Sequence, residues 1–331
     1  MTVSERHTGA IRLWKADLVE MVTAEHLTKH WGDRPVLSDT SFTIGSGVTG
    51  LLGANGSGKT TLFGMFLGLH EPTSGALQVL GLDPRTSGPL IRQRIGYSPE
   101  HEALPADMSA YDFVRHVAEL HGLPRRAAAG RASDALYEVG LGEERARACG
   151  TMSTGQKQRV KLAQAIVHDP QLVLLDEPTN GLDPIQRDEM LSLIRRCGHE
   201  LGLSVILSSH LLDEIERTCD RVSIVANNIV TNGGELRATD DSDRQIVPLV
   251  LELDADPTAT ANFVAALLRA GVQATADPMR SSVVTVEPAT AEATDALHDA
   301  VRDTLAAAGL GVRSMKRQTR TLENLFFEAT Q

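Results

Sequence analysis

Gly53-Ala54-Asn55-Gly56-Ser57-Gly58-Lys59-Thr60 lies between an apolar run, 48–52, and a helical pattern, 60–69. These residues match G-x-x-x-x-G-K-[ST], in which glycines turn backbone N–H groups inward and form a phosphate cradle with the next helix N-terminus. In such a loop Lys59 reaches the β- and γ-phosphates, and the hydroxyl of Thr60 reaches Mg²⁺. The alternative is a plain glycine-rich turn, but the flanking strand and helix favour a nucleotide site.

A second apolar run, Leu172-Val173-Leu174-Leu175, ends in the carboxylates Asp176 and Glu177. A buried parallel strand delivers such acids to the carboxyl edge of a sheet, where ligands bind. Asp176 is therefore predicted to hold Mg²⁺ through water, and Glu177 to be the general base that polarises water aimed at the γ-phosphate. Alone, the run is typical of an ordinary core strand, and the phosphate loop favours the catalytic interpretation.

Apolar runs alternate with helical patterns from Leu18 to about Ala238, which predicts an α/β fold with a mostly parallel sheet flanked by helices. The interval of about 101–170 carries helical patterns without convincing strands, so we expect an inserted helical subdomain there. The runs are 48–52, 172–175, 204–207 and 222–226, and the clearest helical patterns are 60–69 and 185–197.

A new pattern follows residue 240 and predicts a second, smaller α+β domain over 241–331. Gly271 and Gly309 stand where helices end, and the βαββαβ order is typical of a ferredoxin-like fold. The expected elements are strand 246–254, helix 257–270, strand 272–276, strand 282–287, helix 291–308 and strand 311–316.

The two ends of the chain are less regular. Residues 1–17 form an expected N-terminal tail, with one amphipathic turn as the alternative. An amphipathic piece near the other end is expected to dock on either domain or on a partner. It contains Leu322, Leu325 and Phe326.

The composition limits the possible functions. Of the 331 residues 42% are hydrophobic and 23% charged, as in soluble globular proteins. The formal net charge of −11 disfavours a nucleic-acid partner, because phosphate backbones bind basic surfaces. No apolar run approaches the roughly twenty residues that span a bilayer, and the N-terminus lacks a signal-peptide core. We therefore expect a cytoplasmic protein that reaches any membrane through a protein partner.

The motifs resemble those of the ABC (ATP-binding cassette) ATPase family over about 18–238. The resemblance is carried by Gly53 to Thr61, Met152 to Arg159 and Leu174 to Pro184. The family signature, usually Leu-Ser-Gly-Gly-Gln, is matched by Met152-Ser153-Thr154-Gly155-Gln156, with Met and Thr at its first and third places. The resemblance implies a P-loop NTPase fold with a RecA-like core, and ATP and Mg²⁺ as cofactors.

The resemblance also implies roles for residues outside the two motifs. The signature caps the γ-phosphate of ATP held by an opposite subunit, whereas a simple helix N-cap by Ser153 or Thr154 is the alternative. Asp183 belongs to a D-loop that links two sites, or to a plain turn. His210 matches the switch histidine that contacts the γ-phosphate.

Two further positions have a plain structural alternative. Trp31 stands where the family stacks an aromatic ring on adenine, although a lone tryptophan is usually a packing residue. Glu100 takes the place of a glutamine that contacts Mg²⁺ and water, with a solvent-facing acid beside His101 as the alternative. Altogether the resemblance implies catalytic roles for Lys59, Glu177 and His210, metal ligation by Thr60, Asp176 and Glu100, and nucleotide contacts by Trp31, Gly53, Asn55, Gly56, Ser57, Gly58, Lys59, Thr60, Thr61, Glu100, Ser153, Gly155, Gln156 and Asp183.

The chain has one phosphate loop and one signature, and the family's signature acts on an opposite subunit, so the resemblance implies a nucleotide-sandwich dimer, either homodimer or heterodimer. No second cassette and no long coiled coil is present, as translation-factor and DNA-repair relatives would have, so transport is the expected function. The stretch Tyr97-Ser98-Pro99-Glu100 and the C-terminal extension resemble exporter subunits that drive a separate transmembrane permease. This implies a place at the inner face of the cell membrane, through that permease. A non-transport ABC ATPase with a mechanochemical or regulatory role is the alternative.

Overall fold

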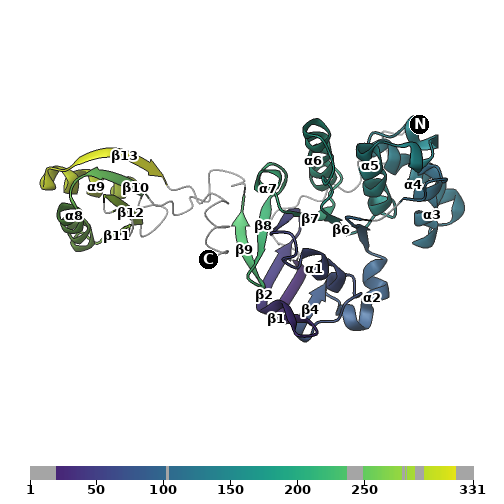
Figure 1. Ribbon diagram of the computed structural model, residues 1–331, viewed down its shortest axis with the longest axis horizontal. Helices are drawn as coiled ribbons and strands as arrows, with labels where there is room; N and C mark the ends of the chain where they lie inside the picture. The colour runs from purple at the N-terminus through teal and green to yellow at the C-terminus, as the bar shows by residue number, and fades with distance from the viewer. Residues whose placement is uncertain are drawn as a thin grey trace. The chain divides into compact units, whose positions relative to one another are not determined.

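The structure, a computed structural model, describes residues 20–101, 104–236, 249–277, 280, 282–287 and 294–317. They fall into two units, one ending at Leu236 and one comprising the later residues (Figure 1). The predicted tail, 1–17, and the apolar piece with Leu322, Leu325 and Phe326 lie outside the described residues. Within the described ranges, no helix has both the length and the apolarity needed to cross a bilayer.

A six-stranded sheet forms the centre of the first unit, in the order β5-β6-β7-β3-β8-β9. All its neighbours run parallel except β9, which pairs antiparallel with β8 at one edge. The strands are β3 (Val48–Leu52), β5 (Ile95–Ser98), β6 (Leu172–Asp176), β7 (Ser204–Ser209), β8 (Arg221–Ala226) and β9 (Ile229–Glu235). Every residue of β3, β6 and β7 is buried, as expected for parallel strands covered on both faces. The predicted apolar runs are confirmed as β3, β6, β7 and β8.

Helices cover both faces of this sheet. The helices of the core are α1 (Lys59–Phe66), α2 (Pro84–Arg92), α6 (Pro184–His199) and α7 (Leu212–Thr218). Gly50 of β3 leaves no room for a Cβ, because the side chain of Ile215 from α7 packs against that point. On the other face, Phe63 and Phe66 of α1 lie in one buried core with Leu51 of β3. The two helical patterns predicted around 60–69 and 185–197 are thus confirmed as α1 and α6.

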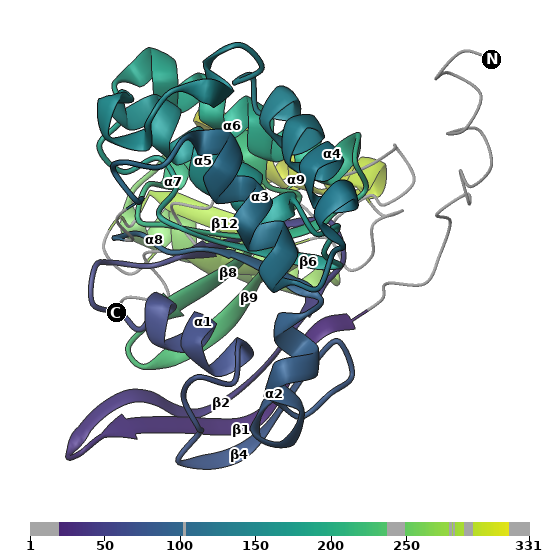
Figure 2. The same cartoon turned by 90° about the vertical axis from the view of Figure 1, so that its right-hand side faces the viewer.

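A three-stranded antiparallel sheet, in the order β2-β1-β4, shares the core on the α1 side (Figure 2). Its strands are β1 (Glu20–Trp31), β2 (Arg34–Gly45) and β4 (Ser74–Val79). The sequence analysis missed this sheet. Register shifts interrupt β1, one of them between Ala24 and Leu27, where His26 adopts a positive φ of 50°. Such bulges break the alternation of buried and exposed residues by which a strand is predicted.

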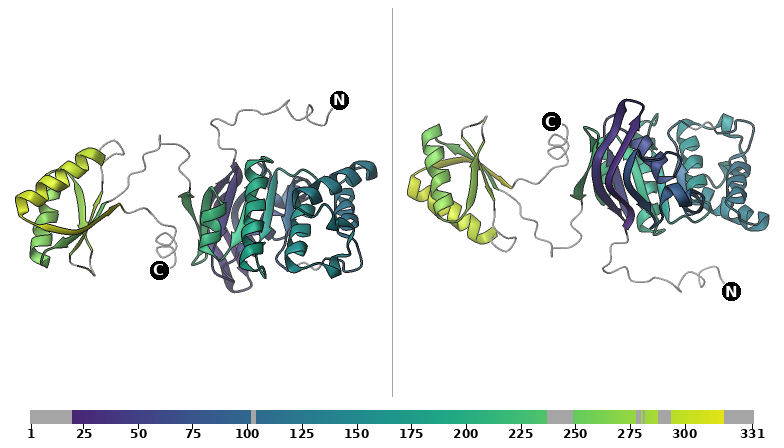
Figure 3. Two further views of the ribbon diagram at one scale, coloured as in Figure 1. Left: turned by 90° about the horizontal axis from the view of Figure 1, so that it is seen from above. Right: turned by 90° about the horizontal axis from the view of Figure 1, so that it is seen from below.

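Between β5 and β6 the chain forms the helices α3 (Ala110–Leu120), α4 (Arg125–Glu138) and α5 (Thr154–Ile166), with short 3₁₀ turns η2 (Glu144–Ala146) and η3 (Cys149–Thr151). The described residues of this interval contain no named strand, which agrees with the predicted insertion. Figure 3 displays these helices gathered at one end of the first unit. Helix α5 begins directly after Ser153, within the stretch predicted as the signature.

The second unit has the elements β10 (Leu249–Asp254), α8 (Pro257–Arg269), β11 (Gln273–Ala276), β12 (Val283–Glu287), α9 (Thr294–Ala308) and β13 (Gly311–Arg317). Its strands pair antiparallel in the order β11-β12-β10-β13, and both helices cover one face of the sheet (Figure 3). Gly271 and Gly309 end the helices with φ of 80° and 62°, as predicted. Phe263 and Val301 from the helices and Leu251 from β10 form a separate buried core.

Candidate nucleotide site

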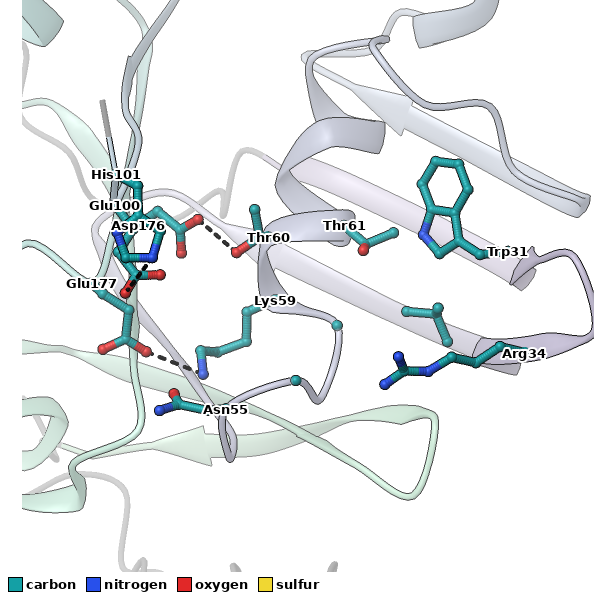
Figure 4. Close-up of a pocket in the computed structure, with 13 residues that line it drawn as sticks. Trp31, Arg34, Asn55, Lys59, Thr60, Thr61, Glu100, His101, Asp176 and Glu177 are labelled. Atoms are coloured by element: carbon teal, nitrogen blue, oxygen red, sulfur yellow. Dashed lines mark hydrogen bonds and ion pairs between the residues drawn. The ribbon is translucent and has the colours of Figure 1, made fainter. Parts of the chain in front are cut away.

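A pocket of about 630 Å³ lies at the carboxyl ends of β3 and β6 (Figure 4). It brings together most of the predicted nucleotide and metal residues, which arrive from distant parts of the chain. Its lining is Trp31, Arg34, Val36, Asn55, Gly56, Gly58, Lys59, Thr60, Thr61, Glu100, His101, Asp176 and Glu177. Arg34, Val36 and His101 were not predicted as site residues.

The phosphate loop has the backbone geometry that its glycines were expected to permit. Gly56 and Gly58 have φ of 80° and 111°, a region that glycine adopts without strain. At Gly53 a Cβ would meet Ser57 Oγ and the carbonyl of Val225. Gly58 provides no side-chain cap for α1, and Ser57 Oγ is buried without a protein partner. Uncapped N–H groups and an unpaired buried hydroxyl fit an oxyanion such as a nucleotide phosphate.

Lys59 places a buried cation in the pocket. Its side chain is 6% exposed, and Nζ donates to the carbonyl oxygens of Gly53 at 2.6 Å and Ala54 at 3.3 Å. The same Nζ lies 3.1 Å from Glu177 Oε1. The loop carbonyls therefore hold the ammonium over the cradle, next to the predicted general base.

Asp176 lies at the end of β6 between two hydroxyl donors. Thr60 Oγ1 donates to Asp176 Oδ2 at 2.8 Å, and Ser208 Oγ donates to Oδ1 at 2.6 Å. Burial raises the pKa of Asp176 above its usual value, against the two hydrogen bonds, which lower it. A carboxylate beside a threonine hydroxyl offers the hard oxygen donors that Mg²⁺ prefers. These residues therefore fit the predicted metal.

Glu177 and His210 form a pair. Glu177 adopts a left-handed backbone conformation with φ of 46°, and its N–H donates to Ser208 Oγ at 2.9 Å. Its Oε2 lies 2.9 Å from His210 Nδ1. His210 does not line the pocket itself, and it contacts the site through Glu177. A strained backbone held by neighbouring groups is common at catalytic positions.

Glu100 lines the pocket, and contacts with neighbouring residues hold both its side chain and its backbone. Oε1 accepts from Asn180 Nδ2 at 2.9 Å and lies 3.3 Å from His101 Nε2. The backbone carbonyl of Glu100 accepts from Lys161 Nζ of α5 at 3.0 Å. The charge of Glu100 also contributes to the raised pKa of Asp176, so the two carboxylates are close. Glu100 is thus an anchored acid of the pocket rather than an unattached surface residue.

Trp31 lies at the rim of the pocket, with 48% of its surface exposed. Lys29 Nζ sits 4.1 Å from the centre of its ring, and His70 meets the ring edge-on at 5.0 Å. Such an exposed ring lies outside the core, and the Lys29 ammonium sits over it. Arg34 pairs with Trp31 across a short turn of β1 and β2. That turn, Gly32-Asp33, is the sequence signal from which Arg34 could have been found.

The signature and the D-loop residue do not line this pocket. Ser153 caps α5 in a capping box, in which its Oγ accepts from Gln156 N and its N–H donates to Gln156 Oε1. Asp183 caps α6 by accepting from Gln186 N. The helix cap considered for Ser153 is therefore present, and Asp183, for which a plain turn was the alternative, also caps a helix. Of the predicted nucleotide contacts, those outside the lining are Gly53, Ser57, Ser153, Gly155, Gln156 and Asp183.

Comparison with known proteins identifies the family. A family model described as ABC transporter matches residues 37–180. The chain is 36% identical over 218 residues to the uncharacterized ABC transporter ATP-binding protein YxlF of Bacillus subtilis, covering 66% of this chain and 72% of that protein. It is 34% identical over 206 residues to the bacitracin transport ATP-binding protein BcrA of Enterococcus faecalis, covering 62% and 66%.

A solved structure is similar over the same part of the chain. The cbiO1 protein of Clostridium perfringens, described as part of the ABC transporter complex cbiONQ, matches with a TM-score of 0.61 and 30% identity. The match covers 66% of this chain and 89% of that one. The segment matched by the family model contains both the phosphate loop and the acid-tipped strand. This chain therefore belongs to the ABC transporter family, as an ATP-binding and ATP-hydrolysing subunit.

Proposed function

We propose that this subunit drives a separate membrane permease, in the direction of export, by forming an ATP-dependent dimer with a second ATPase subunit. One observation carries the proposal. The pocket holds the phosphate loop, Asp176 and Glu177, while the signature at Ser153 lies outside it on the exposed start of α5. Two chains facing each other would each complete the site of the other, as a symmetric interface allows.

The residues of the pocket divide the work of hydrolysis. The backbone N–H groups at the start of α1 and the ammonium of Lys59 hold the phosphate groups. Thr60, Asp176 and Glu100 would hold Mg²⁺, which neutralises charge that develops on the phosphates. Glu177 accepts a hydrogen bond from the attacking water and takes its proton, and His210 orients the Glu177 carboxylate. In this proposal Trp31 stacks on the base, and the remaining contacts come from Gly53, Asn55, Gly56, Ser57, Gly58 and Thr61, with Ser153, Gly155, Gln156 and Asp183 acting across the dimer.

We infer further that the second unit is a ferredoxin-like accessory domain, and that the subunit works at the inner membrane face. The strand order β11-β12-β10-β13 and its antiparallel pairing support the fold. The name of BcrA, a bacitracin transport protein, supports a role in drug or antibiotic movement. The separate core of this unit supports a regulatory rather than a nucleotide-binding role.

Affinity purification of the full chain from its own cell membrane tests the proposal. We expect a polytopic membrane protein to co-purify with the subunit. The ATPase activity of the subunit should rise when that membrane protein is reconstituted with it in vesicles. Uptake into inside-out vesicles separates export from import. Recovery of the active chain with soluble proteins alone would favour a non-transport ABC ATPase.

A further inference from the structure

Glu214, on α7, carries a carboxylate whose residue is 0% exposed. Burying a carboxylate is costly unless its oxygens are hydrogen-bonded or paired with a cation. Here Ser209 Oγ donates to Oε2 at 2.6 Å, and Thr179 Oγ1 donates to the same oxygen at 2.9 Å. Arg187 Nε lies 3.4 Å from Oε1. Oε2 thus accepts two hydrogen bonds, whereas Oε1 is buried without a hydrogen bond and is held by the ion pair with Arg187. Three segments of the chain therefore meet at this carboxylate.

Two of these segments adjoin Glu177, which lines the pocket, and its partner His210. Ser209 directly precedes His210, and Thr179 lies two residues after Glu177. Glu177 and His210 are themselves joined at 2.9 Å. One buried charge therefore links the strand end that carries the histidine to the segment that follows the general base.

Further hydrogen bonds at Ser209 and Thr179 restrict the two segments that carry these residues. Ser209 Oγ donates to Glu214 and also accepts from Leu211 N at 3.0 Å. The residues on either side of His210 are therefore joined by a hydrogen bond. The carbonyl of Thr179 accepts from Leu182 N at 3.2 Å, which closes the turn on that segment. Charge-assisted bonds of this kind are shorter and stronger than neutral ones. The carboxylate of Glu214 therefore fixes where both segments lie.

We propose that Glu214 is a positioning residue for hydrolysis, which holds His210 against Glu177 through Ser209 and Thr179. The proposal rests on the roles given above to Glu177 and His210. Glu214 does not line the nucleotide pocket, so its loss acts on the chemical step rather than on binding. The negative charge matters in this proposal, because it strengthens the hydrogen bonds from both hydroxyls and pairs with Arg187.

Glu214→Gln tests this in the full-length chain. The amide keeps the size of the side chain, but it removes the charge and replaces one acceptor with a donor. We expect kcat to fall by about 10- to 100-fold, as for residues that orient metal ligands through hydrogen bonds, while the Kd of a fluorescent ATP analogue changes by less than about threefold. The matched control is Glu216→Gln, which removes an exposed charge from the same helix and leaves kcat unchanged. A kcat for Glu214→Gln within about twofold of wild type overturns the proposal.

A double-mutant cycle separates positioning from general structural damage. In a chain that already carries His210→Ala, we expect the added Glu214→Gln to lower kcat by less than about threefold, because Glu214 acts through the histidine that has been removed. An equal factor in both backgrounds indicates structural damage and overturns the proposal. Glu177→Gln and His210→Ala are measured alongside: if both keep wild-type hydrolysis, the proposed roles fail together with this inference, whereas their loss beside a wild-type Glu214→Gln removes this inference alone.

Thr179 offers a second route if Glu214→Gln does not fold. Thr179→Ser keeps the hydroxyl that reaches Glu214, and Thr179→Val keeps the shape without it. We expect the serine variant to resemble wild type and the valine variant to lose kcat without losing nucleotide affinity. Equal kcat in the two variants overturns the proposal.

Discussion

Lys59 Nζ lies 3.1 Å from Glu177 Oε1, with each side chain only 6% exposed, so the proposed phosphate-binding cation and the proposed base form a buried ion pair. Removing one member of such a pair leaves an uncompensated charge. A phosphate group entering the loop would compensate Lys59 in place of Glu177. Nucleotide binding and the freedom of the base are therefore coupled through one ammonium group.

Glu177→Gln should lower ATP turnover by about 10²- to 10⁴-fold, the usual worth of a general base. ATP should bind at least as tightly as to wild type, because Lys59 no longer has an anionic partner to give up. The variant should also accumulate as an ATP-bound dimer. Steady-state phosphate release, analogue titration and size-exclusion chromatography with ATP measure the three effects, with the exposed Glu25→Gln as control. Near-wild-type hydrolysis would remove the role assigned to Glu177.

A mixture of Lys59→Ala and Ser153→Arg subunits should recover one composite site. Each variant keeps the half that the other has lost, because the signature of one chain serves the loop of its partner in the proposed dimer. Differently tagged subunits are purified as mixed dimers, and their ATPase is compared with that of each variant alone. Mixed dimers that are no more active than the separate variants contradict assembly in trans.

Glu100→Gln should keep ATP affinity while changing the Mg²⁺ dependence of hydrolysis. A carboxylate ligates Mg²⁺ as a charged oxygen donor, whereas an amide is neutral and also donates hydrogen bonds. The amide also loses the charge that Asn180 and His101 now contact. ATPase activity is measured against Mg²⁺ concentration with and without the permease. Superimposable curves for the variant and wild type would contradict the role of Glu100 in binding Mg²⁺.

Deletion of 241–331 should leave nucleotide binding intact. The nucleotide pocket and its core are built from residues of the first unit, and the second unit has a core of its own. We expect the truncated chain to bind an ATP analogue with the affinity of the full chain and to dimerise or respond to regulation less well. A folded 1–240 fragment, judged by circular dichroism, that no longer binds nucleotide would contradict this division.

His168 should make stability depend on pH below neutrality. Burial lowers the pKa of His168 from 6.5 to about 4, and its ring stacks on His121 at 3.6 Å. Between pH 6.5 and 4, His168 is protonated in the unfolded chain but neutral in the folded chain, so the free energy of unfolding falls as the pH falls. The loss should reach about 2 kcal/mol at pH 5 relative to pH 7. Urea unfolding of His168→Gln should lack this part of the pH dependence, and identical profiles for the variant and wild type contradict it.

Local spacing was sufficient to predict the phosphate loop, the acid-tipped strand and most helix positions. In each case the signal lies within a few residues: glycines before Lys59, an apolar run before Asp176, or glycine after a helix at 271 and 309. The antiparallel sheet was not predicted, because bulges in β1 interrupt the alternation of buried and exposed residues. Arg34 was not predicted because the hairpin turn at Gly32-Asp33 was not recognised, and Ser208 was not predicted because only a parallel strand pair brings it beside Asp176.

The sequence by itself determined which chemical groups this protein has for phosphate, metal and water, because their motifs depend on neighbours along the chain. Only the tertiary structure decided which groups meet. Thr60 reaches Asp176 across 116 positions, and Glu214 reaches Thr179 across 35, because β3, β6 and β7 align their carboxyl ends in one sheet. Hydrogen bonds act over about 3 Å, so a pairing between such distant positions has no signature in the order of residues and is set by the packing of the sheet.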